Sequence, residues 1–444
     1  MTSAMKWTAA TATLITAFAW QHSAFGEVLI GNAGGWKMTT DGRVNAFISW
    51  DRGTGIPENQ PDYIGTVTRD RTHDVAGNIE GTRIRNGFLM SILAFELSKQ
   101  VTENLKVTAR VGVWMNISSG RTKNDPGPVD PRELYGKLEG PWGSLLGGSE
   151  LSLFGRGGIL VDYDIAHGYG LGYPCQIEDA SGGACGMAGF GAPFPGYDPG
   201  FVYTTPNLHG FELAVGIYDP ATVGLGQLNR APLPRVEAEA TFALKDRVRV
   251  FVNAFWQTLE GTITNPDPMK TAGPLIDISA TAKGVQGGLK VKLGPLEIGG
   301  AAVAGQGMSS MMALDENQAS FSQALGIPRK SYGGFGLAGF TIESLHLKLA
   351  GGAGLFHLDK APDDPAPVDA TGTPSNPQLL KQNVGYTLGL YQTTGPVHFA
   401  LEYFRAEHTL YEYGATDPKD PTIVYIKQPR QVVNFVNAGF TVVW

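Results

Sequence analysis

Apolar and polar residues alternate with a period of two along much of the chain. In residues 105–117 the odd positions carry Leu, Val, Ala, Val, Val, Met and Ile, whereas the even positions include Lys, Thr, Arg and Asn. The same alternation recurs over residues 236–244 and 248–256. Successive side chains of a β-strand point to opposite faces, so one face of each segment can meet lipid while the other meets water. These segments run to about ten residues or more, which suits a tilted transmembrane strand and exceeds the usual strand of a soluble sandwich.

Along the whole chain the pattern predicts about sixteen strands. We place them at residues 36–51, 82–98, 104–118, 131–140, 143–152, 199–206, 210–219, 233–244, 247–260, 278–293, 295–306, 331–343, 345–357, 382–394, 396–411 and 431–444.

The joints between these strands alternate in length. The clearest tight turns fall at residues 139–142, 207–209, 245–246, 294–295 and 395–396, and the third and longest of eight long joints spans 153–198. Short turns on one rim, long loops on the other and an even strand number are typical of bacterial outer-membrane barrels. The predicted fold class is therefore all-β, a transmembrane antiparallel β-barrel. Helical spans are not expected, because no stretch offers eighteen consecutive apolar residues.

The two ends of the chain support an exported barrel. Residues 1–26 hold an early Lys6, an apolar stretch too short to cross a membrane, and small residues at 24 and 26, which is the layout of a secretory signal peptide. We therefore expect residues 1–26 to be removed and residues 27–444 to form the barrel domain. The chain ends on Trp444, and alternate residues before it are apolar, which suits a closing strand with an aromatic girdle.

Composition adds two points. Sixty glycines and 17% charged residues fit many tight turns better than a helical enzyme, and the charge balance gives no indication of a nucleic-acid partner. The chain has only two cysteines, Cys175 and Cys185, both in one Gly-rich segment. An exported protein meets oxidising conditions, so we expect these two residues to form a disulfide.

Two hairpins resemble those of the Gram-negative general porin family. Residues 132–148 (RELYGKLEGPWGSLLGG) are similar to the fourth and fifth strands of that family, and residues 201–213 (FVYTTPNLHGFEL) to its sixth-to-seventh hairpin. The terminal aromatic also resembles the assembly signal of outer-membrane proteins, although that residue is more often Phe than Trp. The resemblance implies a homotrimer in the outer membrane of a Gram-negative bacterium, in contact with membrane lipid and lipopolysaccharide. It also implies that the long third loop folds into the lumen.

A selective pore needs charges close to the solute, where water screens them less than in bulk. The acidic motif usual in the third loop of the family is missing, and the acids present there are Asp162, Asp164, Glu178 and Asp179. The candidate bases lie on the early strands, which the resemblance would place on the wall facing that loop: Arg43, Arg83, Arg85, Arg110 and Arg132. Arg110 is the best placed, because an arginine on the lipid face would cost about 2–4 kcal/mol at the bilayer midplane. Each of these residues could instead be a solvated charge with no special role.

The sequence thus predicts a water-filled channel for passive diffusion of ions and small hydrophilic solutes. Two alternatives stay open: a substrate-specific porin for sugars, phosphate or organic acids, and a plugged structural or adhesive barrel. An enzyme is not expected, because the eight histidines form no His-x-x-x-His pair and no Gly-x-Ser-x-Gly elbow occurs. No metal site and no cofactor are predicted.

Overall fold

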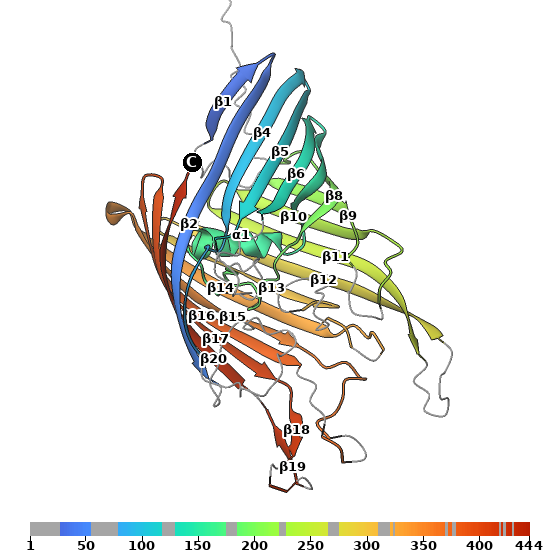
Figure 1. The fold of residues 1–444 in the computed structure, drawn as a ribbon. Coiled ribbons are helices and arrows are strands. Elements are labelled where there is room, and N and C mark those ends of the chain that lie inside the picture. The colour runs from blue at the N-terminus through green and yellow to red at the C-terminus, as the bar shows by residue number, and fades with distance from the viewer. Residues whose placement is uncertain are drawn as a thin grey trace, which may run out of the picture.

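The wall of the molecule is a closed antiparallel β-barrel with sixteen strand positions (Figure 1). The structure, a computed structural model, describes residues 27–54, 79–117, 129–174, 184–221, 228–264, 275–309, 320–322, 325–368, 372–374, 379–416, 419–420, 423–428 and 430–444. The wall strands are β2 (Trp36–Thr54), β3 (Ile79–Arg85), β4 (Ser91–Thr102), β5 (Leu105–Met115), β6 (Val129–Gly140), β7 (Gly143–Leu151), β8 (Tyr197–Thr204), β9 (Phe211–Tyr218), β10 (Arg235–Leu244), β11 (Val248–Thr264), β12 (Leu275–Leu293), β13 (Leu296–Gln306), β14 (Lys330–Ile342), β15 (Leu347–Leu358), β16 (Leu380–Thr394), β17 (Val397–Leu410) and β20 (Arg430–Val443). The predicted fold class and strand number are confirmed.

Two short segments share the second position in the wall. Strand β3 pairs with residues 47–53 of β2, and β4 pairs with residues 37–43 of the same strand. The chain between them, residues 86–90, leaves the ladder. The sequence analysis placed one strand over residues 82–98 and missed this break, where the outward-facing side chains change from even positions (Ile84) to odd ones (Phe95 and Leu97).

The barrel closes between the first and last wall strands. Arg43 on β2 pairs with Val443 on β20, and the ladder continues to Thr54 and Val432. The backbones of Gly42 and Trp444 exchange two hydrogen bonds, each of 3.0 Å. Strand β1 (Val28–Ala33) pairs with the part of β2 that extends beyond the end of β20.

The two faces of the wall differ in the way that the period of two predicts. On β9, for example, the apolar side chains of Phe211, Leu213, Val215 and Ile217 are exposed, whereas the alternate residues are buried. In a barrel the exposed apolar face meets lipid and the other face lines the interior.

Short turns and long connections lie at opposite ends of the barrel. Gly294 and Gly395 have φ values of 61° and 58°, which favour glycine, and they permit tight turns at two of the predicted sites. At the other end, residues of the last long connection form a small hairpin, β18 (Tyr413–Thr416) with β19 (Val424–Lys427), as Figure 1 shows. Among the described residues, no helix is long and apolar enough to span a membrane.

Candidate pore constriction

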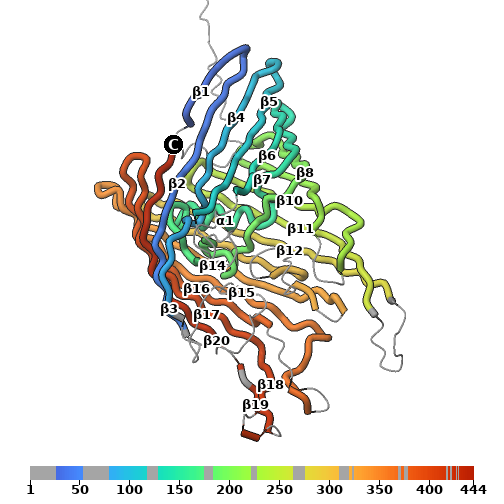
Figure 2. The backbone as a smooth tube through the Cα atoms, viewed as in Figure 1, coloured from blue at the N-terminus to red at the C-terminus, as the bar shows by residue number. Residues whose placement is uncertain are grey.

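The third long connection, between β7 and β8, lies inside the barrel (Figure 2). Its described residues include the helix α1 (Arg156–Ile165) and the short 3-10 helix η2 (His167–Tyr169). The helix contacts the inner faces of β11 to β14. Side chains on both sides of it, such as Leu153 and Phe190, are fully buried. The third loop therefore folds into the lumen, as the family resemblance implied.

The first end of this loop is held by acidic residues of the wall. The backbone N–H of Phe154 donates to Glu237 Oε2 at 2.7 Å, and Arg156 Nη2 lies 2.6 Å from Glu239 Oε1. Both glutamates lie on β10 and are buried. Carboxylates at the start of a helix also interact favourably with its dipole. These contacts fix the beginning of α1 against one side of the lumen.

A buried side-chain network, the Asp162–His167 latch (Asp162, His167 and Thr387), holds the middle of the loop. Asp162 Oδ1 lies 2.6 Å from His167 Nδ1, and the backbone N–H of Met187 donates to Asp162 Oδ2 at 2.7 Å. His167 Nε2 lies 2.9 Å from Thr387 Oγ1 on β16. Burial lowers the pKa of His167, but the charge and hydrogen bond of Asp162 and the charge of Glu402 outweigh it and raise the pKa above its ordinary value.

Glu402 on β17 holds the next part of the loop. Its Oε2 accepts the backbone N–H groups of Leu171 at 2.8 Å and Gly172 at 3.0 Å. Its Oε1 accepts the hydroxyl of Tyr391 at 2.8 Å, and Asn437 Nδ2 donates to the carbonyl of Gly172 at 2.9 Å. The loop is thus anchored on β10 at one end and on β16, β17 and β20 further along, so it crosses the lumen.

Glycines of the inner wall let the loop lie directly on the backbone of the strands. A Cβ added to Gly354 would lie 2.0 Å from the carbonyl oxygen of Phe190, and one added to Gly385 would lie 2.7 Å from the Phe190 ring. Neither distance is possible for a real side chain without movement of the loop. The high glycine content therefore serves this contact as well as the turns.

The four predicted acids have different positions. Asp162 is fully buried within the latch, so its carboxylate is used inside the loop. Asp164 keeps 20% of its side chain exposed and lies 2.9 Å from Lys290 Nζ on β12. Glu178 and Asp179 lie outside the described residues, so their role stays a prediction.

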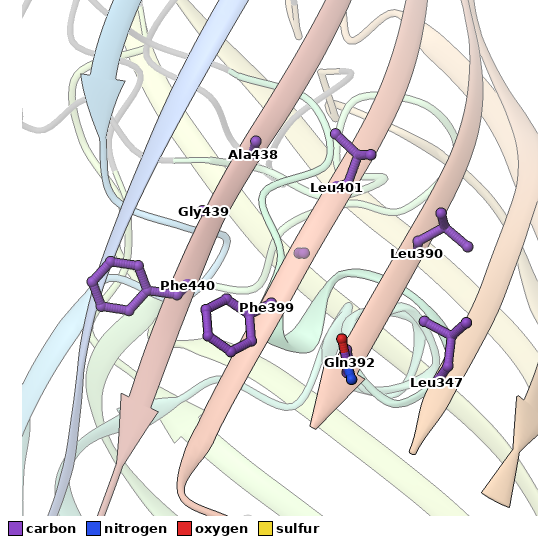
Figure 3. A pocket seen from close by; sticks show the side chains of 9 residues that line it. Leu347, Leu390, Gln392, Phe399, Leu401, Ala438, Gly439 and Phe440 are labelled. Atoms are coloured by element: carbon purple, nitrogen blue, oxygen red, sulfur yellow. The ribbon is translucent and has the colours of Figure 1, made fainter. Parts of the chain in front are cut away.

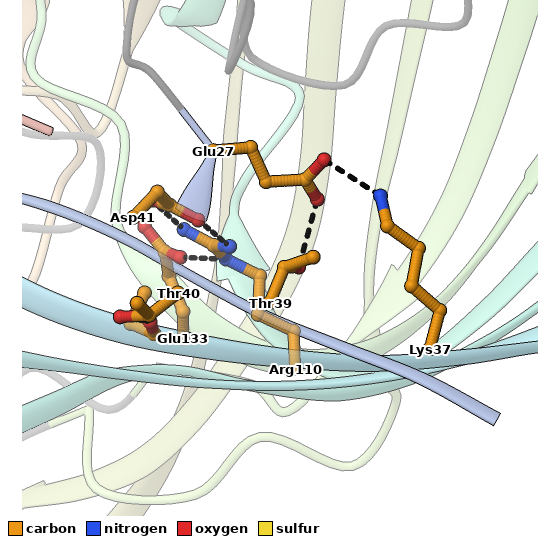
Figure 4. A network of polar contacts seen from close by, with 8 residues as sticks. Glu27, Lys37, Thr39, Thr40, Asp41, Arg110 and Glu133 are labelled. Atoms are coloured by element: carbon orange, nitrogen blue, oxygen red, sulfur yellow. Dashed lines mark hydrogen bonds and ion pairs between the residues drawn. The ribbon is translucent and has the colours of Figure 1, made fainter. Parts of the chain in front are cut away.

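Arg110 points to the interior, as its even position in the alternating segment 105–117 predicted. Its guanidinium forms ion pairs with acidic side chains (Figure 4). Its Nη1 lies 2.6 Å from Asp41 Oδ2, and its Nε lies 2.5 Å from Glu133 Oε2. Only 2% of its side chain is exposed. The geometry assigns Arg110 to a buried ion pair that links β2, β5 and β6.

The other predicted bases also lie on the inner wall. Arg43 and Arg85 are buried, and the guanidinium of Arg43 lies 5.9 Å from the centre of the Tyr163 ring on α1. Arg83 pairs across the sheet with the buried Ser49. Arg132 contacts Asp130 at 2.6 Å and lies over the Trp114 ring.

The structure brings together four charged groups that the sequence did not single out as a set. This rim charge cluster consists of Asp164, Lys290, Glu297 and Lys348. Lys348 Nζ lies 2.5 Å from Glu297 Oε2 and donates to the carbonyl of Asp164 at 2.8 Å, and Lys290 Nζ lies 3.5 Å from Glu297 Oε1. The alternation along the predicted strands 278–293 and 345–357 could have placed both lysines on the inner face of the wall. It could not have shown that they lie beside Asp164.

Of the two predicted disulfide partners, only Cys185 is described. It is buried in the loop core beside Tyr173 and Met187. Cys175 lies outside the described residues, so the Cys175–Cys185 bond stays a prediction.

A closed barrel with an apolar exterior and a charged interior defines an outer-membrane channel. The chain matches the family model described as Gram-negative porin over residues 8–426, and it therefore belongs to that family. It is an outer-membrane protein of Gram-negative type that forms a channel for passive diffusion. Its family and its fold are those of channels and not of enzymes.

Solved structures share the fold at low sequence identity. The outer membrane channel DcaP of Acinetobacter baumannii is 13% identical with a TM-score of 0.57, covering 93% of this chain and 99% of that one. The anion-selective porin from Comamonas acidovorans is 12% identical with a TM-score of 0.54, covering 92% and 100%. OmpT of Vibrio cholerae in its trimer form is 11% identical with a TM-score of 0.50, covering 92% and 100%. A search of curated protein sequences found no match.

Proposed function

We propose that the channel selects solutes at the boundary between the third loop and the wall, and that the rim charge cluster is part of this constriction. The observation that supports the proposal is the contact between Asp164 of α1 and Lys290 of β12, with 20% and 18% of their side chains exposed. Charges of both signs then meet beside the passage, close to the turn at Gly294. Such groups act on a permeating ion more strongly than exposed charges, because less water screens them.

The aromatic residues of the third loop do not support the alternative of a substrate-specific porin. Tyr173 and Phe190 are fully buried, and their rings lie 4.9 Å apart in an edge-to-face contact. They pack the loop against the wall and do not form a track for sugar rings. We therefore propose a general channel for small hydrophilic solutes and ions.

We further propose that the channel is a homotrimer in contact with membrane lipid and lipopolysaccharide. OmpT of Vibrio cholerae, which shares the fold, has a trimer form. The exposed apolar bands of the strands provide the surface that lipid and neighbouring protomers would cover.

Planar-bilayer recordings under a salt gradient test the constriction. We expect Lys290→Met to shift the reversal potential toward cation selectivity, because it removes a positive charge beside the passage. The shift should be a clear fraction of the about 59 mV that a tenfold gradient gives a perfectly selective channel. Lys245→Met is the control: it removes the same charge from an exposed short turn between β10 and β11, away from the rim charge cluster, and should shift the potential much less.

Equal shifts in the two variants would contradict a constriction at the rim charge cluster. A wild-type protein that inserts but gives no stable conductance steps would favour the plugged barrel.

A further inference from the structure

Apolar side chains gather at two different places on the barrel. On the outer surface, residues such as Phe399 and Phe440 line a groove that lipid can cover (Figure 3). At the long-loop end, Met308 and Phe321 of the sixth loop, residues 307–329 between β13 and β14, are 0% and 3% exposed. The lumen of a porin is polar, so the place of these two side chains decides what the sixth loop does to the passage.

The sixth loop folds into the barrel. A Cβ added to Gly284 on β12 would lie only 2.5 Å from Met308 Sδ. Gly284 pairs across the sheet with Phe255, which is buried on the inner face of β11, and residues that stand directly opposite each other share a face. Phe321 belongs to the same buried cluster as Met308 and Phe255. Both side chains of the sixth loop therefore lie inside the wall.

Three loops meet at this point, in a set of side chains that we call the loop junction (Phe154, Leu228, Met308 and Phe321). Phe154 comes from the third loop, and its ring lies 4.6 Å from that of Phe255. Leu228 comes from the fourth loop, and a Cβ added to Gly326 of the sixth loop would lie 3.2 Å from its Cγ. The loop junction is buried and apolar, so it excludes water from the lumen beside β11 to β13.

An ion pair with the seventh loop, residues 359–379, holds the sixth loop in this position. Arg329 Nε lies 2.7 Å from Asp364 Oδ2 and its Nη2 lies 2.5 Å from Oδ1, so the contact is bidentate. Arg329 Nη1 donates to the carbonyl of Phe321 at 2.5 Å, which joins the pair to the loop junction. Asp363 Oδ2 accepts the backbone N–H of Leu325 at 2.9 Å. Both side chains of this Arg329–Asp364 clasp are 4% exposed.

The burial of the clasp indicates that it determines the position of the loop more than the stability of the barrel. Removal of two charges from water costs about as much as their attraction returns, so a buried ion pair adds little net stability. The planar guanidinium nevertheless has directional hydrogen bonds, and these hold the sixth loop in one place. Loss of one partner leaves the other charge buried and unpaired, and movement of the loop toward solvent restores its hydration.

We propose that the sixth loop forms a second narrowing of the channel at its long-loop end, with Arg329 and Asp364 as the positioning residues that keep it in the lumen. The loop junction is apolar and the charges of the clasp neutralise each other, so this narrowing limits solutes by size. It is separate from the rim charge cluster, which lies near the turn at Gly294 and acts on charge. Solutes that enter from the long-loop end meet the size limit first.

Planar-bilayer recordings with poly(ethylene glycol) of graded size, added to one side at a time, test the narrowing. Asp364→Asn should raise the single-channel conductance, and it should admit larger polymers from the long-loop side than the wild type does. Asp359→Asn is the matched control, because it removes the same charge from the same loop at a side chain that is 48% exposed. The control should keep the conductance and the size limit of the wild type, and both variants should have the same reversal potential.

Thiol labelling measures the position of the loop separately. Met308→Cys should resist a water-soluble maleimide in an otherwise unchanged protein and should react when it is combined with Asp364→Asn. The chain without Met308→Cys gives the background from the native cysteines. Labelling that increases while the conductance and the size limit stay unchanged would show that the loop moves without limiting passage, and it would overturn the narrowing. No change in any of the three would overturn the role of the clasp.

A milder variant keeps the test decisive if Asp364→Asn does not fold, as judged by its mobility on an unheated gel. Asp363→Ala removes the contact to the backbone of Leu325 and leaves the Arg329–Asp364 clasp in place. It should change the conductance, the size limit and the labelling in the same direction but to a smaller extent. A folded Asp363→Ala protein with wild-type values of all three would count against the proposal.

Discussion

The guanidinium of Arg110 lies between two carboxylates that come from different strands. Asp41 on β2 and Glu133 on β6 both contact it, and all three groups are largely withdrawn from solvent. Asp41 pairs across the sheet with Ala94 on β4, whose small side chain leaves room for Arg110 to reach over the intervening strand. A charge that is neutralised in this way contributes little to the field in the pore, so its main effect is on the stability of the wall.

We expect Arg110→Met to destabilise the barrel, because it leaves two buried carboxylates without their cation. Removal of one partner from a buried ion pair costs about 3–5 kcal/mol. The free energy of unfolding can be measured by urea titration in lipid vesicles, with folded protein detected by its mobility on an unheated gel.

The triple variant Asp41→Asn, Arg110→Met, Glu133→Gln is the control, since it removes all three charges together. It should recover much of the lost stability. An Arg110→Met protein as stable as the wild type would contradict a structural role for this residue.

At the scale of single elements, the alternation of side chains predicts the wall strands well because it is repeated over ten or more residues in each. It does not predict α1, whose sequence RGGILVDYDI has glycine at its second and third positions. Glycine is among the weakest helix formers, so local propensity argues against this helix. Its stability comes from β10 to β14, which the sequence places more than eighty residues away.

The same limit applies to the candidate site. Lys290 and Lys348 contact Asp164 across 126 and 184 residues of sequence. The odd or even position of a lysine in a strand determines which face of the sheet it occupies. It does not determine which residue of an inserted loop the lysine contacts. For this reason Asp164 could be proposed from the sequence, whereas its partners could not.

The Asp162–His167 latch makes the order of the loop depend on pH. The pKa of His167 is raised in the folded protein, so the stabilisation by its charged form is complete below the ordinary pKa of about 6.5 and is lost as pH rises through the folded value. We expect the current through open channels to become noisier as pH increases from about 5 to about 9, because the loop then moves more.

His167→Gln should remove most of this pH dependence. His346→Gln is the matched control, because His346 lies in an exposed turn and contacts none of the latch residues. A pH-dependent noise that survives in His167→Gln, or that disappears in His346→Gln, would contradict the latch.

At the scale of the whole molecule, the first described residues and the C-terminus lie at the same end of the barrel. Glu27, which follows the predicted cleavage, accepts hydrogen bonds from Lys37 and Thr39, so it lies against the wall at the short-turn end. The C-terminal Trp444 meets Gly42 at the same end. An even number of strands returns both ends of the chain to one side of the membrane.

We expect the protein purified from outer membranes to begin at Glu27. N-terminal sequencing and intact mass measure this directly. The same mass, compared before and after reduction, tests the predicted Cys175–Cys185 bond, and the double variant Cys175→Ser, Cys185→Ser is the control that should show no change. A mature protein that begins elsewhere would exclude the cleavage before Glu27.

The position of the loop anchors ties the docking of the loop to completion of the wall. The groups that hold the loop after α1 belong to β16, β17 and β20 and lie 220 to 265 residues beyond their loop partners. A loop that entered the lumen before these strands were in place would have its contacts on β10 but not the later ones. A barrel that lacked its last strands would therefore lack the groups that hold the loop across the lumen.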